Sequence, residues 1–354
     1  METTQRQVLV TGGNGFLALH IVRELLGHAI AVRATVRTME RSAEVTDALA
    51  SRGVSTQGLS FIEADLMSDK NWEAAMVGIT DVVSVASPVF PDSGSGHSAQ
   101  PSEADMAAST EGTLRILRAA AGAGVRRVVM TANFGAVGFS NRDKTSITTE
   151  ENWTDENEPG LSAYEKSKLL AEKSAWKFVE DRENAGLFAP ELVSINPVAI
   201  LGPALGHHVS GSFGIVDSIM SGSMKRIPPI ELNVVDVRDV ADLHVKELEV
   251  PQAAGQRFIA SAEGIISMTQ IADLIRQQRP ELAASISRRR LPGFAVRLGS
   301  LVSEQAREAK LLMEINRHVS TSKAQDLLGW SPRYTKEETV LAAVDSLASR
   351  NQKR

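Results

Sequence analysis

The stretch QVLVTGGNGFLA, residues 7–18, constrains the fold more than any other part of this 354-residue chain. It joins a short apolar run to a glycine-rich turn and then to apolar residues at helical spacing. Gly13-x-Gly15-x-x-Ala18 fits a dinucleotide-binding fingerprint with alanine last, and Gly12-x-x-Gly15-x-x-Ala18 fits the variant with glycines three apart. Because glycines let backbone N–H groups approach a pyrophosphate at a helix N-terminus, the stretch predicts a nucleotide site.

Short apolar runs alternate with helical patterns from this turn to about residue 140. That rhythm predicts βαβ units, whose right-handed crossovers place helices on both faces of a parallel sheet. We therefore expect an α/β fold, a Rossmann-type doubly wound parallel sheet with a smaller C-terminal substrate-binding lobe.

The pattern changes in the second half of the chain. Residues 140–160 are polar and rich in turn formers, so we expect a loop over one edge of the sheet. We expect residues 1–205 to form the nucleotide-binding domain, with residues 233–261 returning to it. Residues 206–232 and 262–354 are then left for the substrate-binding lobe.

Composition limits the classes of function. The chain has no cysteine, which excludes disulfides, thiolate chemistry and cysteine-based zinc sites. His207 and His208 lack further ligands at suitable spacing, so we expect no metal site. A net charge of −5 does not suggest a nucleic-acid partner. The N-terminus lacks a signal-peptide pattern, and no window approaches the roughly 20 apolar residues that span a bilayer, so we expect a cytoplasmic protein without a membrane partner.

The end of the second expected strand discriminates between cofactors. NAD-binding proteins usually carry an acidic residue there, which binds the ribose 2′-hydroxyl. VRATVRTMER has no acid at that point but places Arg37 there and Arg41 one helical turn later. Two guanidiniums can hold a 2′-phosphate, so the sequence favours NADP(H), although two solvated arginines would look the same. Asp65, at the end of the third strand, can accept a hydrogen bond from adenine or cap a helix.

SAYEKSK contains Tyr164 and Lys168, which share one face of a helix because they are four residues apart. A nearby ammonium group favours the phenolate and should lower the pKa of Tyr164. Tyr164 then becomes a candidate general acid–base, and Lys168 can also hold ribose hydroxyls. An exposed Tyr–Lys pair on an amphipathic helix is the alternative interpretation.

With these residues assembled, the chain resembles the extended branch of the short-chain dehydrogenase/reductase superfamily. Within it, the chain is most similar to the dihydroflavonol reductase-like group, which includes aldehyde and carbonyl reductases. The resemblance covers about the first 250 residues, and its motifs are VLVTGGNGFLA, VRATVR, DVVSVASPV, EGTLRILRAA, VVMTANFGAV, SAYEKSKLLAE, INPVAILGP and VDVRDVADLHV, with LLGWSPR near the end.

The resemblance implies contacts along the whole cofactor. The implied pyrophosphate contacts are Thr11, Gly12, Gly13, Asn14, Gly15, Phe16 and Leu17. The resemblance implies that Arg37 contacts the 2′-phosphate and that Asp65 and Leu66 contact the adenine. It also implies that Ala86, Ser87 and Pro88 pack near the nicotinamide-side ribose, and that Pro197 and Ile200 border the nicotinamide ring.

One part of the family pattern is missing. In the family the fifth strand ends in Thr-Ser-Ser, and the second serine bonds the substrate carbonyl. TANFGAV places Asn133 at that position and Ala132 before it. The Asn133 amide can donate a hydrogen bond, and Thr131 keeps a hydroxyl two residues earlier, so either can replace the serine. Ser109 stands where many members carry an asparagine.

The hypothesis that follows is an NADPH-dependent reductase of a small-molecule aldehyde or ketone, acting as a monomer or homodimer. One alternative is a nucleotide-sugar epimerase or dehydratase, or a hydroxysteroid-type dehydrogenase. Another is a non-catalytic NADP(H)-binding redox sensor, which the loss of the serine favours. The residues that could line the substrate pocket, or simply pack the core, are Phe90, Phe134, His207 and Phe213.

Overall fold

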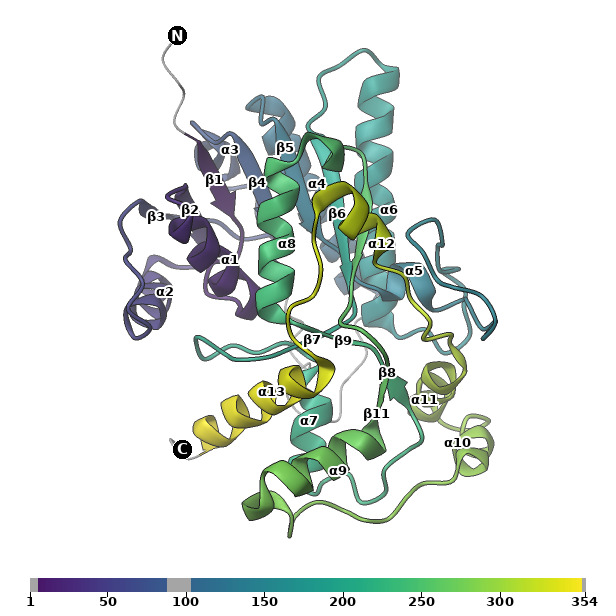
Figure 1. Cartoon of the computed structure of the whole chain (residues 1–354). Helices are drawn as coiled ribbons and strands as arrows, with labels where there is room; N and C mark the ends of the chain where they lie inside the picture. Colours follow the sequence, from purple (N-terminus) through teal and green to yellow (C-terminus); the bar gives the residue numbers. More distant parts are fainter. Residues whose placement is uncertain (1–5, 88–102, 352–354) are drawn as a thin grey trace.

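The computed structural model describes residues 6–87 and 103–351 (Figure 1). Its centre is a parallel sheet of seven strands within these ranges, in the order β10-β6-β5-β4-β1-β2-β3. This order confirms the doubly wound sheet, because the strands run outward in both directions from β1 and β4. The strands are β1 (Gln7–Val10), β2 (Ala31–Val36), β3 (Leu59–Glu63), β4 (Asp81–Ser84), β5 (Arg127–Thr131), β6 (Glu191–Pro197) and β10 (Arg257–Ala260).

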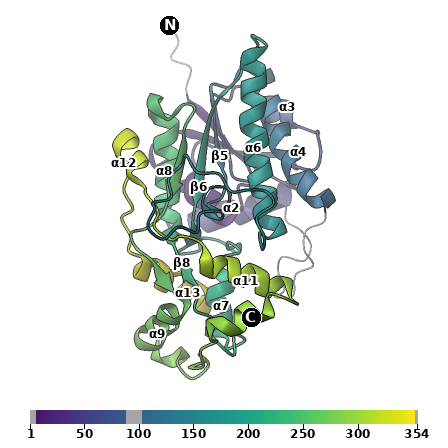
Figure 2. The same cartoon turned by 90° about the vertical axis from the view of Figure 1, so that its right-hand side faces the viewer.

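Helices cover both faces of the sheet (Figure 2). One face carries α1 (Phe16–Gly27), α2 (Ser42–Ala50) and α8 (Val237–Glu249), and the other carries α3 (Trp72–Met76), α4 (Glu103–Gly122) and α6 (Ala163–Asn184). Successive side chains of a strand point to opposite faces. Val8 and Val10 of β1 accordingly enter the apolar cluster under α1 and α8, whereas Leu9 enters the one under α4 and α6.

A smaller lobe lies beyond the carboxyl ends of the strands (Figure 1). Two short sheets belong to this region: β7 (Ala199–Leu201) pairs in parallel with β9 (Val234–Asp236), and β8 (Glu231–Leu232) pairs antiparallel with β11 (Ile266–Ser267). Its helices are α7 (Phe213–Met220), α9 (Met268–Gln278), α10 (Gly293–Gly299), α11 (Glu304–Glu314) and α13 (Lys336–Asn351). The remaining short elements are α5 (Gly135–Gly138), α12 (Ser322–Leu328), η1 (Met39–Arg41), η2 (Pro251–Ala253) and η3 (Pro280–Leu282).

The segment around α12 does not stay in the lobe. It packs against β10 and η2 at the edge of the sheet. Trp330, which follows α12, is 1% exposed and its indole N–H donates to the Asp239 carbonyl of α8 at 3.0 Å. This part of the range expected to form the lobe therefore covers the nucleotide-binding unit. In the described ranges no helix is both long and apolar enough to cross a membrane.

Candidate active site

The glycine turn between β1 and α1 is built for close approach to a ligand. Gly12 has a φ of +64°, and its N–H donates to Thr35 Oγ1 at 2.9 Å. The Gly13 N–H donates to the Thr35 carbonyl at 2.8 Å, and a Cβ at Gly13 would lie 2.7 Å from the Cβ of Ala34. Because a side chain fits at neither position, the two glycines keep the turn flat against β2.

The first turn of α1 has free backbone donors. Gly15 is the N-cap residue, in extended conformation, and no side chain of the described residues caps the helix. The Thr11 hydroxyl accepts from the N–H groups of Val85 (3.0 Å) and Ala86 (2.9 Å), which fixes the chain after β4 beside the turn. An uncapped helix N-terminus behind a glycine turn fits the pyrophosphate of a dinucleotide.

The arginines at the end of β2 differ in their surroundings. Arg37 is exposed, and no ion pair joins it to any residue in the described ranges. Arg41 lies 3.9 Å from Glu44, which also accepts from Asn14 Nδ2 at 2.8 Å. His208 lies 3.3 Å from the same carboxylate. Arg37 is therefore the freer cation for a 2′-phosphate.

The expected adenine residues lie together after β3. Asp65 Oδ1 accepts from the Met67 N–H at 3.0 Å, so the carboxylate also shapes its own turn. Leu66 is 8% exposed, and its carbonyl accepts from Arg115 of α4.

The expected nicotinamide-side residues are only partly covered by the structure. Pro197 is buried at the end of β6, and its carbonyl accepts from the Phe134 N–H at 3.0 Å. Ile200 is half-buried in β7. The predictions for Pro88 and Phe90 fall outside the described residues.

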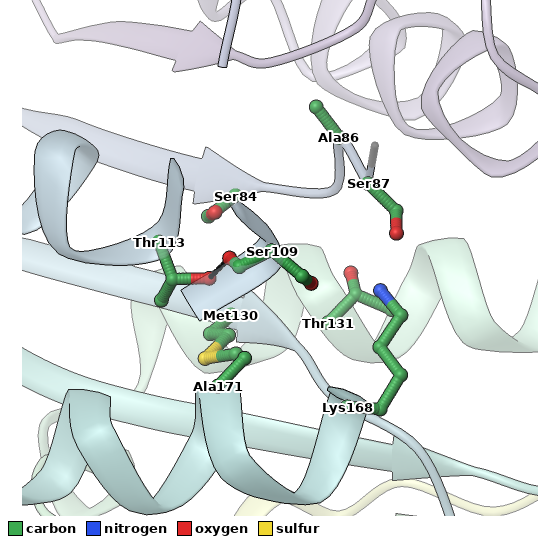
Figure 3. Close-up of a pocket in the computed structure, with 9 residues that line it drawn as sticks. All are labelled: Ser84, Ala86, Ser87, Ser109, Thr113, Met130, Thr131, Lys168 and Ala171. Carbon is green, nitrogen blue, oxygen red and sulfur yellow. Dashed lines mark hydrogen bonds between the residues drawn. The ribbon is translucent and has the colours of Figure 1, made fainter. Parts of the chain in front are cut away.

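Helix α6 positions the Tyr–Lys pair. Ser162 caps the helix by accepting from the Glu165 N–H at 3.2 Å, so the first turn, which carries Tyr164, is well defined. Tyr164 is 44% exposed. One turn later, Lys168 lines a small cavity at the carboxyl ends of β4 and β5, beside Thr131 and Ser87 (Figure 3). Figure 3 shows the ammonium nitrogen of Lys168 and the Thr131 hydroxyl on the same side of this cavity.

The electrostatics of this pair differ from the prediction. The surrounding protein and the Glu165 carboxylate raise the pKa of Tyr164, and the Asn133 hydrogen bond only partly opposes this. The expectation that the pKa of Tyr164 is lowered is therefore wrong, because desolvation has the largest influence on the phenol. Desolvation also lowers the pKa of Lys168 to about 8, although Glu165 opposes this shift. The Tyr164 phenol is consequently protonated at neutral pH.

The Thr131 hydroxyl is already engaged. It lies 2.8 Å from Nε2 of His244 on α8, whose Nδ1 lies 2.7 Å from the Val240 carbonyl. Burial lowers the pKa of His244 to about 4, so the ring is neutral. Because Nδ1 must carry the proton to bond a carbonyl, Nε2 accepts and Thr131 donates to it. The Thr131 hydroxyl then has only lone pairs left to offer.

The Asn133 side chain is oriented by its own turn. Its Oδ1 accepts from the Gly135 N–H, and its side chain lies near enough to the Tyr164 phenol to lower the pKa of that group. With the oxygen occupied, Nδ2 is the end that remains for a ligand. The structure thus places Asn133 beside Tyr164, and it places Lys168, one helical turn further along α6, beside Thr131 at the carboxyl end of β5.

Two carboxyl groups beside the site were not predicted. Desolvation raises the pKa of Glu165 to about 7, and Glu308 of α11 adds to the shift while Lys168 opposes it. The Glu165 Oε2 is buried without a hydrogen-bond partner among the described residues and presses on Gly135, where a Cβ would lie 2.0 Å away. Its place directly after Tyr164 was the only sequence signal for it.

The residues expected to line the substrate pocket are distributed differently. Phe213 is 1% exposed and packs edge-on against Phe16, with ring centroids 5.1 Å apart. Phe134 is 3% exposed and packs edge-on against Phe139. Both rings therefore pack in the hydrophobic core and do not line an open substrate pocket. His207 is exposed in the loop after β7.

Two relatives of this chain are named as reductases, and a solved reductase structure shares its fold. Ketoreductase azaE of Aspergillus niger is 32% identical over 302 residues, which cover 80% of this chain and 85% of that protein. The NADPH-dependent methylglyoxal reductase GRE2 of Saccharomyces cerevisiae is 30% identical, covering 79% of this chain and 84% of the relative. The crystal structure of yeast methylglyoxal/isovaleraldehyde reductase Gre2 complexed with NADPH superimposes with a TM-score of 0.77 at 26% identity, covering 98% of this chain and 100% of the other.

The family itself follows from a match to a family model. The sequence model of the 3-beta hydroxysteroid dehydrogenase/isomerase family matches residues 9–248, which run from β1 to the end of α8. The match therefore includes the glycine turn, Asn133, Tyr164 and Lys168. This chain belongs to the 3-beta hydroxysteroid dehydrogenase/isomerase family, within the extended short-chain dehydrogenases/reductases.

Proposed function

We propose that this protein is an NADPH-dependent reductase that converts an aldehyde or ketone into an alcohol. The observation that carries the proposal is that Tyr164 lies beside Asn133, while Lys168, one turn further along α6, lines a cavity with Thr131 and Ala86. A phenol, an ammonium and an amide donor are the groups needed to protonate and polarise a carbonyl oxygen. The relatives named above are reductases, which supports the same reaction type.

The cofactor assignment rests on the chain's own residues. Gly12, Gly13 and Gly15 would hold the pyrophosphate, Arg37 the 2′-phosphate and Lys168 the ribose hydroxyls next to the nicotinamide. When bound, NADPH supplies the hydride that reduces the carbonyl carbon. The NADPH in the yeast Gre2 structure supports this choice over NAD.

The protein's part in the reaction is to donate hydrogen bonds and one proton. Asn133 Nδ2 donates to the substrate oxygen and stabilises the negative charge that develops there. Tyr164, kept protonated by its surroundings, gives its proton to the same oxygen. The ammonium of Lys168 then stabilises the phenolate that is left.

The test follows NADPH oxidation at about 340 nm, the absorbance of the reduced nicotinamide, with aldehydes, ketones and α-ketoesters and with NADH in parallel. We expect turnover with NADPH and far less with NADH. Tyr164→Phe should lose nearly all turnover while still binding NADPH. Tyr334→Phe is the matched control, since Tyr334 is the only other tyrosine and packs on Arg238 instead.

A redox sensor without turnover is the second candidate, because Asn133 replaces the family's serine. A sensor would bind NADPH, reduce nothing in the panel and behave alike with Tyr164 or phenylalanine. An epimerase, dehydratase or hydroxysteroid-type dehydrogenase would instead favour NAD. Reduction of a carbonyl by NADH alone would contradict the proposed cofactor.

A further inference from the structure

A buried polar network lies directly behind Asn133. Asn196, near the end of β6, is 0% exposed, and its Nδ2 donates to the Asn133 backbone carbonyl at 3.1 Å. The same nitrogen donates to Glu172 Oε2 at 2.7 Å. The Asn133 carbonyl also accepts from the Ala136 N–H at 3.0 Å. Both lone pairs of this carbonyl are therefore occupied, which fixes the peptide plane from which the Asn133 side chain projects.

The network reaches the Tyr–Lys helix. Glu172 is 0% exposed and stands on α6 at a spacing of four residues from Lys168, which itself follows Tyr164 by four. Its Oε1 accepts from Ser194 Oγ at 2.7 Å and from Arg257 Nε at 2.9 Å. One helix thus carries the proton donor and, two turns on, the carboxylate that anchors the opposite donor.

Arg257 ties the network to the loop expected over the sheet edge. From β10, its Nη1 donates to the carbonyls of Glu150 (2.7 Å) and Asn152 (3.0 Å). Its guanidinium also lies 3.5 Å from the centre of the Trp153 ring. Arg257 therefore neutralises the charge of Glu172, and the loop carbonyls and the Trp153 ring hold the guanidinium in place.

If this network served only to stabilise the fold, its buried polar groups would be an unfavourable choice. The Asn196 Oδ1 is buried and has no hydrogen-bond partner among the described residues, which costs free energy. A buried ion pair such as Arg257–Glu172 is rarely more stable than apolar residues of the same volume. Buried polar groups that cost free energy in this way are expected where the exact position of a functional group matters.

We propose that Asn196 and Glu172 are positioning residues, which hold the Asn133 amide at the place where the substrate oxygen binds. The inference rests on the proposed function. An asparagine side chain has more torsional freedom than the serine of the family pattern. Fixing it therefore needs support at the backbone, from Asn196, as well as at Oδ1, from Gly135.

The test is a double-mutant cycle with Asn196→Ala and Asn133→Ala, measuring kcat, KM, the Kd for NADPH and the melting temperature. Misplacing a donor by about 1 Å can cost about 100-fold in rate. We therefore expect Asn196→Ala to lower kcat by about 10-fold to 100-fold, with KM and Kd nearly unchanged. In the Asn133→Ala background the same change should have almost no further effect.

Two further variants separate positioning from folding. Glu172→Gln keeps the shape of the side chain and should lower kcat in the same way, again only when Asn133 is present. Asn316→Ala removes another fully buried asparagine, whose Nδ2 donates to the Ser146 carbonyl at 2.8 Å outside the network, and should leave kcat unchanged. Equal losses of kcat in both Asn133 backgrounds would overturn the inference.

A crystal structure of Asn196→Ala tests the inference without turnover. We expect the Asn133 side chain to lose its single orientation, and an unchanged Asn133 would refute the positioning role. If the wild type reduces no carbonyl while this structural change occurs, the proposed function fails and the positioning role stands.

Discussion

Asn133 shows how one residue can replace the donor of a family motif. Its Oδ1 is held by Gly135, and its side chain lies beside Tyr164. Thr131, the other candidate, donates its one hydrogen bond to His244 and cannot donate a second one. The amide is therefore the group we expect to contact the substrate oxygen.

Replacing this amide tests its role directly. Asn133→Ala should lower kcat by about 100-fold, the usual cost of losing one donor to a developing oxyanion. Asn133→Ser restores a hydroxyl and should recover part of the loss. Steady-state kinetics of both variants with NADPH decide the matter, and a wild-type kcat in Asn133→Ala would rule the amide out as the donor.

The raised pKa of Glu165 predicts how the stability of the fold depends on pH. Its pKa is raised from 4.5 to about 7, so between these values the folded state binds a proton that the unfolded state has released. Stability from this group is present below pH 4.5 and is lost as the pH rises through about 7. We expect Glu165→Gln to melt at a higher temperature than wild type at pH 8, and the difference to shrink towards pH 5. A variant that melts lower at pH 8 would contradict this.

At the scale of elements, the junction of β1 and α1 is the most constrained. A Cβ at Gly13 would lie 2.7 Å from Ala34, so Gly13→Ala must push the turn away from β2. Overpacking of this kind costs about 1–3 kcal/mol. We expect the affinity for NADPH to fall by about 10-fold or more, since 1.4 kcal/mol is tenfold.

Gly214 offers the matched control. It is an exposed helical glycine of α7, and a Cβ there would have no atom within 4 Å. Gly214→Ala should leave NADPH binding unchanged and raise stability slightly, because alanine favours a helix over glycine by about 1 kcal/mol. Calorimetric titration of both variants checks the pair, and equal affinities would contradict the close approach.

The sequence predicts those elements that carry a recognisable motif within one short segment. The β1–α1 junction and the Tyr–Lys helix each carry a motif whose spacing matches their geometry. Helix α10 was not predicted, because its apolar residues do not mark a buried face: Phe294 is 67% exposed and Leu298 is 62% exposed. Glu172 and Asn196 were missed for another reason, since their roles depend on contacts between β6, α6 and the end of β5.

At the scale of the whole molecule, cofactor binding should stabilise the fold. A ligand at 100 times its Kd adds about 2.7 kcal/mol to the free energy of unfolding. We expect NADPH to raise the melting temperature more than NADH at equal concentration, because only NADPH carries the phosphate for Arg37. Arg37→Ala should remove that difference, whereas Arg226→Ala, at an exposed arginine of the lobe, should preserve it. Equal shifts in wild type would contradict NADP(H) specificity.

The packing of α12 and Trp330 against the sheet edge and α8 has a consequence for folding during translation. The sheet is complete once β10 has left the ribosome, but the edge of that strand stays uncovered until α12 and Trp330 follow. A nascent chain therefore carries an exposed sheet edge for some 60 residues of translation, and exposed edges invite pairing with other chains. The α12 segment thus arrives late in synthesis and covers an edge that is open to pairing with other chains until then.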